Sequence, residues 1–145
     1  METVRELLAQ KGRELLMVSP GTTVLQAAQM MNERGTGSVL VTEDGALAGI
    51  FTERDLMRRV VAVDRLPGAT TVAEVMTSSL ITCTPDATLD DCGAVMSERR
   101  IRHLPVLGPD GVEGVVTTGD LLAHELKEKD SKIAQLESFV FYVRS

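Results

Sequence analysis

A threonine and an aspartate lie three residues apart at two places in the chain, each pair at the end of an apolar stretch that begins with glycine. The pairs are Thr52 with Asp55, and Thr117 with Asp120. A hydroxyl and a carboxylate at this spacing cap the N-terminus of a helix. They also suit a ribose phosphate, because free N–H groups at a helix N-terminus bind phosphate and a carboxylate accepts hydrogen bonds from two hydroxyls. The spacing therefore indicates a helix cap, a ligand site or both.

The two pairs belong to a longer internal repeat, which is the first property to establish in such a chain. Residues 49–56, GIFTERDL, return 65 residues later as GVVTTGDL, and Pro20 and Thr23 have counterparts in Pro85 and Thr88 at the same offset. Capping alone tolerates Ser, Asn or Asp in place of Thr. The faithful duplication therefore favours a ligand-binding role. We also expect the glycine that starts each stretch to let a ligand approach the backbone closely.

Hydrophobic periodicity and turn residues predict the same order of elements in both repeats: strand, helix, strand, strand, helix. In the first repeat they are residues 15–18, 23–34, 38–41, 47–51 and 52–59. In the second they are 81–83, 88–99, 103–107, 112–116 and 119–126. We predict an α/β (α+β) fold with one repeat and an N-terminal helix in residues 1–66 and the other repeat in 67–126. Each repeat is too small to bury a large core alone, so the two should pack together.

Residues 127–145 belong to neither repeat. Ile133, Leu136, Val140 and Val143 recur at helical spacing, which predicts a C-terminal amphipathic helix. This helix could pack on its own domain or form a short seam with a second copy, and the pattern is too short to separate the two.

Composition narrows the function. The net charge is −6 and no basic stripe interleaves with aromatic residues, which argues against nucleic acid as the partner. No apolar run reaches the length of a membrane span and the N-terminus lacks a signal-peptide core, so we expect a cytoplasmic protein. Cys83 and Cys92 have no metal or redox spacing and are expected to be packed side chains. No catalytic constellation is present, so the prediction is a protein that is not an enzyme, with no metal and no required cofactor.

These motifs together resemble a tandem pair of cystathionine-β-synthase-type (CBS) domains, often called a Bateman module. The mark of that family is Gly, three residues, Thr or Ser, two residues, Asp and an apolar residue, and both copies fit it. Residues 101–106, IRHLPV, match the second-strand motif well, whereas residues 36–41, TGSVLV, match it loosely. The resemblance covers about residues 3–126. It implies two domains packed with pseudo-twofold symmetry around two equivalent clefts.

The resemblance also implies the ligand, which would be an adenosine compound: AMP, ADP or ATP, with S-adenosylmethionine or NAD as alternatives. Asp55 and Asp120 would hold the ribose, and Thr52 and Thr117 would lie beside ribose or phosphate. Arg102 and His103 would meet phosphate, although His103 could instead be a strand-end histidine that only packs. Backbone near the adenine would come from Val18, Gly37, Ser38, Val39, Thr82, His103 and Pro105.

The two predicted clefts differ in charge, because Arg102 and His103 stand where the first repeat has Gly37 and Ser38. Phosphate favours fixed positive charge, so we expect a charged nucleotide in the Asp120 cleft. Arg34 is assigned to the favourable charge at a helix C-terminus instead. The predicted function is a stand-alone regulatory, energy-sensing module that acts through a change of shape, as a homodimer and on a protein partner whose identity is unknown. The alternative is a ligand-independent interaction scaffold that acts through the C-terminal helix.

Overall fold

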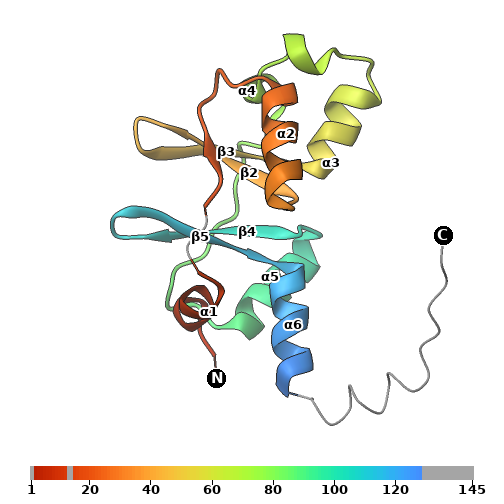
Figure 1. The fold of residues 1–145 in the computed structure, drawn as a ribbon. Helices are drawn as coiled ribbons and strands as arrows, with labels where there is room; N and C mark the ends of the chain where they lie inside the picture. The colour runs from red at the N-terminus through yellow and green to blue at the C-terminus, as the bar shows by residue number, and fades with distance from the viewer. Residues whose placement is uncertain (1, 13–14, 129–145) are drawn as a thin grey trace, which may run out of the picture.

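The two repeats form two stacked halves in the computed structural model, which describes residues 2–12 and 15–128 (Figure 1). The first half contains a three-stranded sheet of β1 (Met17–Val18), β2 (Ser38–Glu43) and β3 (Ala46–Thr52), in that order. Its helices are α2 (Val24–Arg34) and α3 (Glu53–Leu56), and α3 continues into a π-helical turn, η1 (Met57–Val61). The predicted order of elements in the first repeat is confirmed.

The second half contains the antiparallel hairpin of β4 (His103–Gly108) and β5 (Gly111–Thr117), with α5 (Leu89–Arg99) and α6 (Thr118–Glu128) packed beside it (Figure 1). The prediction of a full strand at residues 81–83 was wrong, because only Cys83 forms a bridge, parallel to Val106. In the first half the Leu40 N–H donates to the Leu16 carbonyl at 2.9 Å. Pro105 stands at the position of Leu40 in the second repeat and has no N–H to donate, so this ladder bond cannot form.

The short helices that precede the repeats pack on opposite halves. Helix α1 (Val4–Lys11) buries Val4, Leu7 and Leu8 in the core of the second repeat. Helix α4 (Val72–Val75), which follows the 3-10 turn η2 (Pro67–Ala69), buries its two valines in the core of the first. Backbone hydrogen bonds hold both helices in these positions. The Val4 N–H donates to the Ala87 carbonyl at 2.9 Å, and the Val24 N–H donates to the Thr70 carbonyl at 2.8 Å. Each half is therefore completed by a segment from outside its own repeat. We call these two segments, α1 in the second half and the stretch from α4 to Thr77 in the first, the exchanged segments.

Each core contains the helix face that periodicity predicts. Val24, Ala27 and Met31 of α2 are buried in the first core, and Leu89, Cys92 and Met96 of α5 in the second. Both cysteines are free, and Cys83 packs against the second core. The predicted C-terminal amphipathic helix lies outside the described residues, since the description ends with α6 at Glu128. Over residues 2–12 and 15–128, no helix combines the length and the apolar character that a membrane crossing needs.

Candidate ligand-binding site

Both Thr–Asp pairs cap the helix that they precede. The Thr52 N–H donates to Oδ2 of Asp55 at 3.0 Å, and the Asp55 N–H donates back to the Thr52 hydroxyl at 3.3 Å. The Thr117 N–H donates to Oδ2 of Asp120 at 2.9 Å, and the Asp120 N–H donates to the Thr117 hydroxyl at 3.1 Å. These reciprocal bonds are capping boxes. The capping role is thus present in both copies, and a ligand role depends on what else each carboxylate contacts.

Asp55 is enclosed by protein groups, and its side chain is only 7% exposed. The Thr77 hydroxyl donates to Oδ1 at 3.1 Å and lies 3.4 Å from Oδ2, and the Arg59 guanidinium lies 3.8 Å from Oδ1. Thr77 is held in place because it exchanges two backbone hydrogen bonds with Ile50, each 2.9 Å long. Both oxygens of the Asp55 carboxylate therefore already have protein donors.

Asp120 is more open, with a side chain that is 18% exposed. Its Oδ2 accepts from the Thr117 N–H and from the Lys11 ammonium, which lies 2.7 Å away. Among the residues that the structure describes, none donates a hydrogen bond to Asp120 Oδ1. The two aspartates are equivalent in sequence, but Asp120 keeps one oxygen that accepts no hydrogen bond from the described residues, whereas both oxygens of Asp55 accept one.

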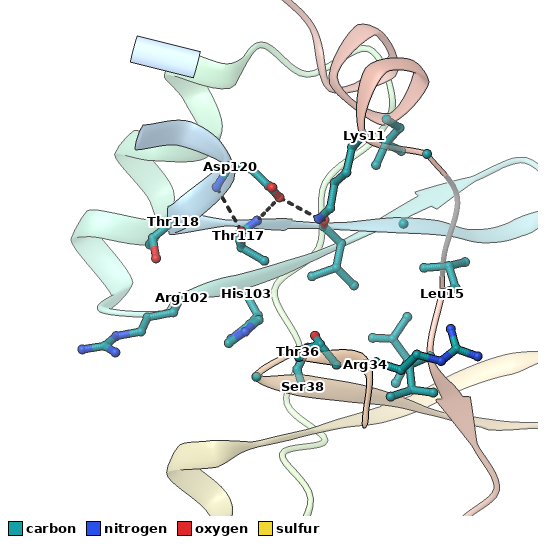
Figure 2. A pocket seen from close by; sticks show the side chains of 18 of the residues that line it. Lys11, Leu15, Arg34, Thr36, Ser38, Arg102, His103, Thr117, Thr118 and Asp120 are labelled. Atoms are coloured by element: carbon teal, nitrogen blue, oxygen red, sulfur yellow. Dashed lines mark hydrogen bonds and ion pairs between the residues drawn. The ribbon is translucent and has the colours of Figure 1, made fainter. Parts of the chain in front are cut away.

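Asp120 faces a pocket of about 490 Å³ between the two halves, which we call the Asp120 pocket (Figure 2). From the predicted site it includes Thr117, Arg102, His103, Gly37 and Ser38. It also includes residues that the sequence did not indicate, and those with polar groups are Lys11, Thr36, Glu53 and Thr118, together with Arg34 at the end of α2. The pocket thus combines a carboxylate at a helix start with several cationic side chains.

Asp55 faces a second pocket of about 590 Å³, the Asp55 pocket, with Thr52 and Thr77. Arg54 and Arg58 are its own cationic groups. Three residues line both pockets: Glu53, Arg102 and His103. The Asp55 pocket is therefore cationic as well, although its carboxylate is enclosed.

Four predicted residues line neither of these pockets. Val18 and Val39 are buried in the first core, and Pro105 is buried on β4. Thr82 is exposed in the segment before Cys83. The structure thus brings together the polar part of the predicted site and leaves most of the predicted adenine-lining backbone outside the two pockets.

The site residues that sequence reasoning missed come from distant segments. Lys11 ends α1 and reaches Asp120 across 109 residues of sequence. Arg34 was interpreted only as a favourable charge at a helix end. No local sequence motif indicates a ligand role for either residue. Lys11 could have been found only from knowing that α1 packs on the second half of the molecule.

The glycines of the two motifs accommodate neighbouring protein segments. A Cβ on Gly49 would lie 2.5 Å from the sulfur of Met76 and 2.9 Å from the Thr77 carbonyl. A Cβ on Gly114 would lie 2.5 Å from a methyl group of Leu8. The expected close approach is therefore real at Gly49, but the group that approaches is the exchanged segment and not a ligand. Gly114 lines the Asp120 pocket and also receives α1.

His103 lies between the two pockets, and burial lowers its pKa below the ordinary histidine value. The nearby Glu53 carboxylate opposes this shift, and Lys11 and Arg102 reinforce it. His103 is therefore neutral near pH 7 in the ligand-free protein. Among the described residues, Lys11, Arg34 and Arg102 supply the permanent positive charge of the Asp120 pocket.

Known families provide an independent comparison. The family model described as "CBS domain" matches residues 4–62 and again residues 72–127. The chain belongs to the CBS domain family. The two matches coincide with the two repeats, so this protein is a CBS domain pair.

Relatives of this CBS domain pair include the CBS domain-containing protein YhcV of Bacillus subtilis, which is 33% identical over 81% of this chain and 84% of its own length. The mitochondrial CBS domain-containing protein CBSX3 of Arabidopsis thaliana is 31% identical over 95% of this chain and 71% of its own length. A solved structure of a putative signal-transduction protein with CBS domains from Burkholderia ambifaria is 38% identical, has a TM-score of 0.82, and is matched over 86% of this chain and 94% of that chain. The predicted fold class and family are confirmed.

Proposed function

We propose that this CBS domain pair binds an adenosine nucleotide in the Asp120 pocket and acts as a regulatory module. One observation carries the proposal: the Asp120 carboxylate faces a pocket of about 490 Å³ with one oxygen free of donors from the described residues. That volume is within the range of small-molecule sites, about 300–1,000 Å³. A carboxylate with a free oxygen can accept the hydrogen bonds of ribose hydroxyls.

The charge of the pocket supports a phosphate group on the ligand. Lys11, Arg34 and Arg102 contribute positive charge, against the two carboxylates of Glu53 and Asp120. Charge-assisted hydrogen bonds from Arg and Lys to phosphate are among the stronger polar contacts in proteins. The N-terminus of α6, at Thr118, adds a positive dipole end, while the N–H groups of Thr118 and Asp120 already donate to the Arg102 carbonyl and the Thr117 hydroxyl.

The Asp55 pocket is the weaker ligand site in this proposal, so one ligand per chain is expected. Asp55 accepts from Thr52 and Thr77 and has Arg59 nearby, so a ribose would have to share both oxygens with protein donors or displace them. Such displacement costs binding free energy, because the displaced donors lose their partner.

A protein of the same fold supports the ligand class. The CBS domain pair of protein MJ0100 was solved with 5′-methylthioadenosine and S-adenosylmethionine, and it matches 89% of this chain with a TM-score of 0.75. At 23% identity, it indicates only that the fold accommodates adenosine compounds. The signal-transduction description of the Burkholderia protein supports a regulatory role in the same way.

Thermal unfolding with millimolar AMP, ADP, ATP, NAD or S-adenosylmethionine tests the proposal. A ligand at 100 times its dissociation constant stabilises a protein by about 2.7 kcal/mol, which raises the melting temperature of a domain of this size by roughly 5–10 °C. We expect a rise with at least one compound and its loss in Asp120→Ala. Asp86→Ala, which removes an exposed acid paired with Arg5, is the matched control and should keep the response. No response to any compound would refute nucleotide binding.

The surface supports self-association with a second copy. Met57 and Val61 are 57% and 65% exposed, and their counterparts in the second repeat, Leu122 and Leu126, are 57% and 41% exposed. Because the internal repeat places apolar side chains at matching positions, a twofold contact between two copies would bury both pairs. A homodimer with this contact should dissociate in Met57→Glu with Leu122→Glu, as measured by sedimentation equilibrium. A wild-type protein that is monomeric at tens of micromolar would refute it.

The alternative, a scaffold that acts through the C-terminal helix, concerns residues outside the described part of the chain. Function in cells that survives Asp120→Ala and is lost on deletion of residues 129–145 would favour this alternative.

A further inference from the structure

We propose that Lys11 makes the Asp120 pocket selective for phosphorylated ligands over the corresponding nucleosides. The inference rests on the proposed function and adds to it a specificity-determining residue from outside the repeated motifs. The ligand class that it indicates is a phosphate ester of an adenosine compound.

The position of the Lys11 ammonium is the first argument. Its nitrogen lies 2.7 Å from Oδ2 of Asp120 and 2.9 Å from the Val115 carbonyl oxygen. Figure 2 shows the side chain reaching from α1 toward Asp120, whereas the head groups of Arg34 and Arg102 point away from that carboxylate. Among the described residues, Lys11 is thus the cation that contacts the Asp120 carboxylate. An ammonium has three N–H donors, and these two acceptors use two of them.

Lys11 is not needed to hold α1 in place. Val4, Leu7 and Leu8 are buried in the second core, and the N–H groups of Val4 and Arg5 donate to Ala87 and Pro85, each at 2.9 Å. The Lys11 side chain is 36% exposed, and an ion pair with that exposure contributes little to stability. The contact between Lys11 and Asp120 can therefore open at small cost when a ligand enters.

The first repeat has no equivalent cation from its exchanged segment. There the segment after α4 supplies the neutral Thr77 hydroxyl to Asp55. Arg59 also approaches Asp55, but it belongs to the turn that follows the motif itself. A cation supplied by an exchanged segment is therefore specific to the Asp120 pocket among the described residues.

These contacts lead to selectivity. When one ribose hydroxyl donates to the free Oδ1 of Asp120 and the other to Oδ2, the second displaces the ammonium from Oδ2, while the Val115 carbonyl can keep it at the pocket. A phosphate on the ligand gives the displaced ammonium a new charged partner. A nucleoside gives the displaced ammonium no new charged partner. Lys11 thus strengthens binding of the nucleotide and adds nothing to binding of the nucleoside.

Titration calorimetry of adenosine and AMP, at low salt, tests the inference on the full chain. We expect Lys11→Met to weaken AMP binding by about tenfold or more, the loss of one charge-assisted bond, while adenosine binding stays the same or tightens. Lys11→Arg should keep most of the preference for AMP. The matched control is Arg5→Met, which removes an exposed ion pair to Asp86 from the same helix, and it should behave as wild type. Lys11→Gln, which retains a donor for Val115, repeats the test if the Met variant does not fold.

Each other outcome refutes a distinct statement. Equal weakening of adenosine and AMP in Lys11→Met means that Lys11 acts through structure, and unchanged binding of both means that it has no role. Either result overturns the inference and leaves nucleotide binding intact. The proposed function itself fails if the wild type binds neither compound, or if Asp120→Ala binds them as tightly as the wild type does. In either case the inference fails with it.

Discussion

The two motif aspartates should respond oppositely to truncation, because one is enclosed by protein and the other faces a pocket. Asp55→Ala removes the half of the capping box in which the Thr52 N–H donates to the carboxylate, worth about 1 kcal/mol. It also leaves the Thr77 hydroxyl without its acceptor in a part-buried site, at roughly 1–3 kcal/mol. The expected loss in the free energy of unfolding is the sum, about 2–4 kcal/mol.

Asp120→Ala removes the same half of a capping box, about 1 kcal/mol, and the partly exposed contact with Lys11, which adds roughly 0–1 kcal/mol. The Asp55 variant should therefore be the less stable by about 1–2 kcal/mol. Ligand response should follow the reverse order: Asp55→Ala should keep the stabilisation by nucleotide at a temperature where it is folded, and Asp120→Ala should lose it.

Urea unfolding, analysed with the same dependence of free energy on urea concentration for both variants, measures the difference in stability. The same experiment with nucleotide present measures the difference in ligand response. Equal destabilisation by the two substitutions, or a larger effect at Asp120, would refute the argument that Thr77 converts Asp55 into a structural residue. Loss of the nucleotide response in both variants would mean that the two carboxylates share the ligand.

Two further predictions follow from close contacts and from charge. Gly49→Ala should lower the free energy of unfolding by about 2–3 kcal/mol, because the new methyl group meets the rigid carbonyl of Thr77. Gly114→Ala should lower it by only about 1 kcal/mol, because there the methyl group meets the flexible end of Leu8. Equal shifts of the two urea midpoints would contradict this reasoning. Since burial lowers the pKa of His103, the unfolded chain binds more protons between that pKa and the unfolded value of about 6.5. The free energy of unfolding should therefore fall as pH drops through this window, and His103→Asn should reduce the pH dependence; a variant with an unchanged pH profile would contradict this.

The order of elements was predictable because it depends on local periodicity and turn residues. The face of α2 that carries Val24, Ala27 and Met31 is buried as the helical spacing predicts, and its counterpart on α5 is buried in the same way. The strand predicted at residues 81–83 failed for a reason that is not local, because Pro105 on the neighbouring strand lacks the N–H that the pairing needs.

The sequence by itself determined the repeat, the family and the two capped helix starts, because these depend on residue types at short, regular spacing. Arg102 and His103 favoured the Asp120 cleft for a charged ligand, but the equivalent motifs gave no sign that the Asp55 carboxylate is enclosed and the Asp120 carboxylate is open. Only the tertiary structure decided their different surroundings, through the exchange of the lead-in segments between the halves. That exchange brings the Thr77 hydroxyl to Asp55, 22 residues away, and the Lys11 ammonium to Asp120, 109 residues away. A neutral donor from a fixed backbone encloses one carboxylate, and a partly exposed cation leaves the other available to a ligand.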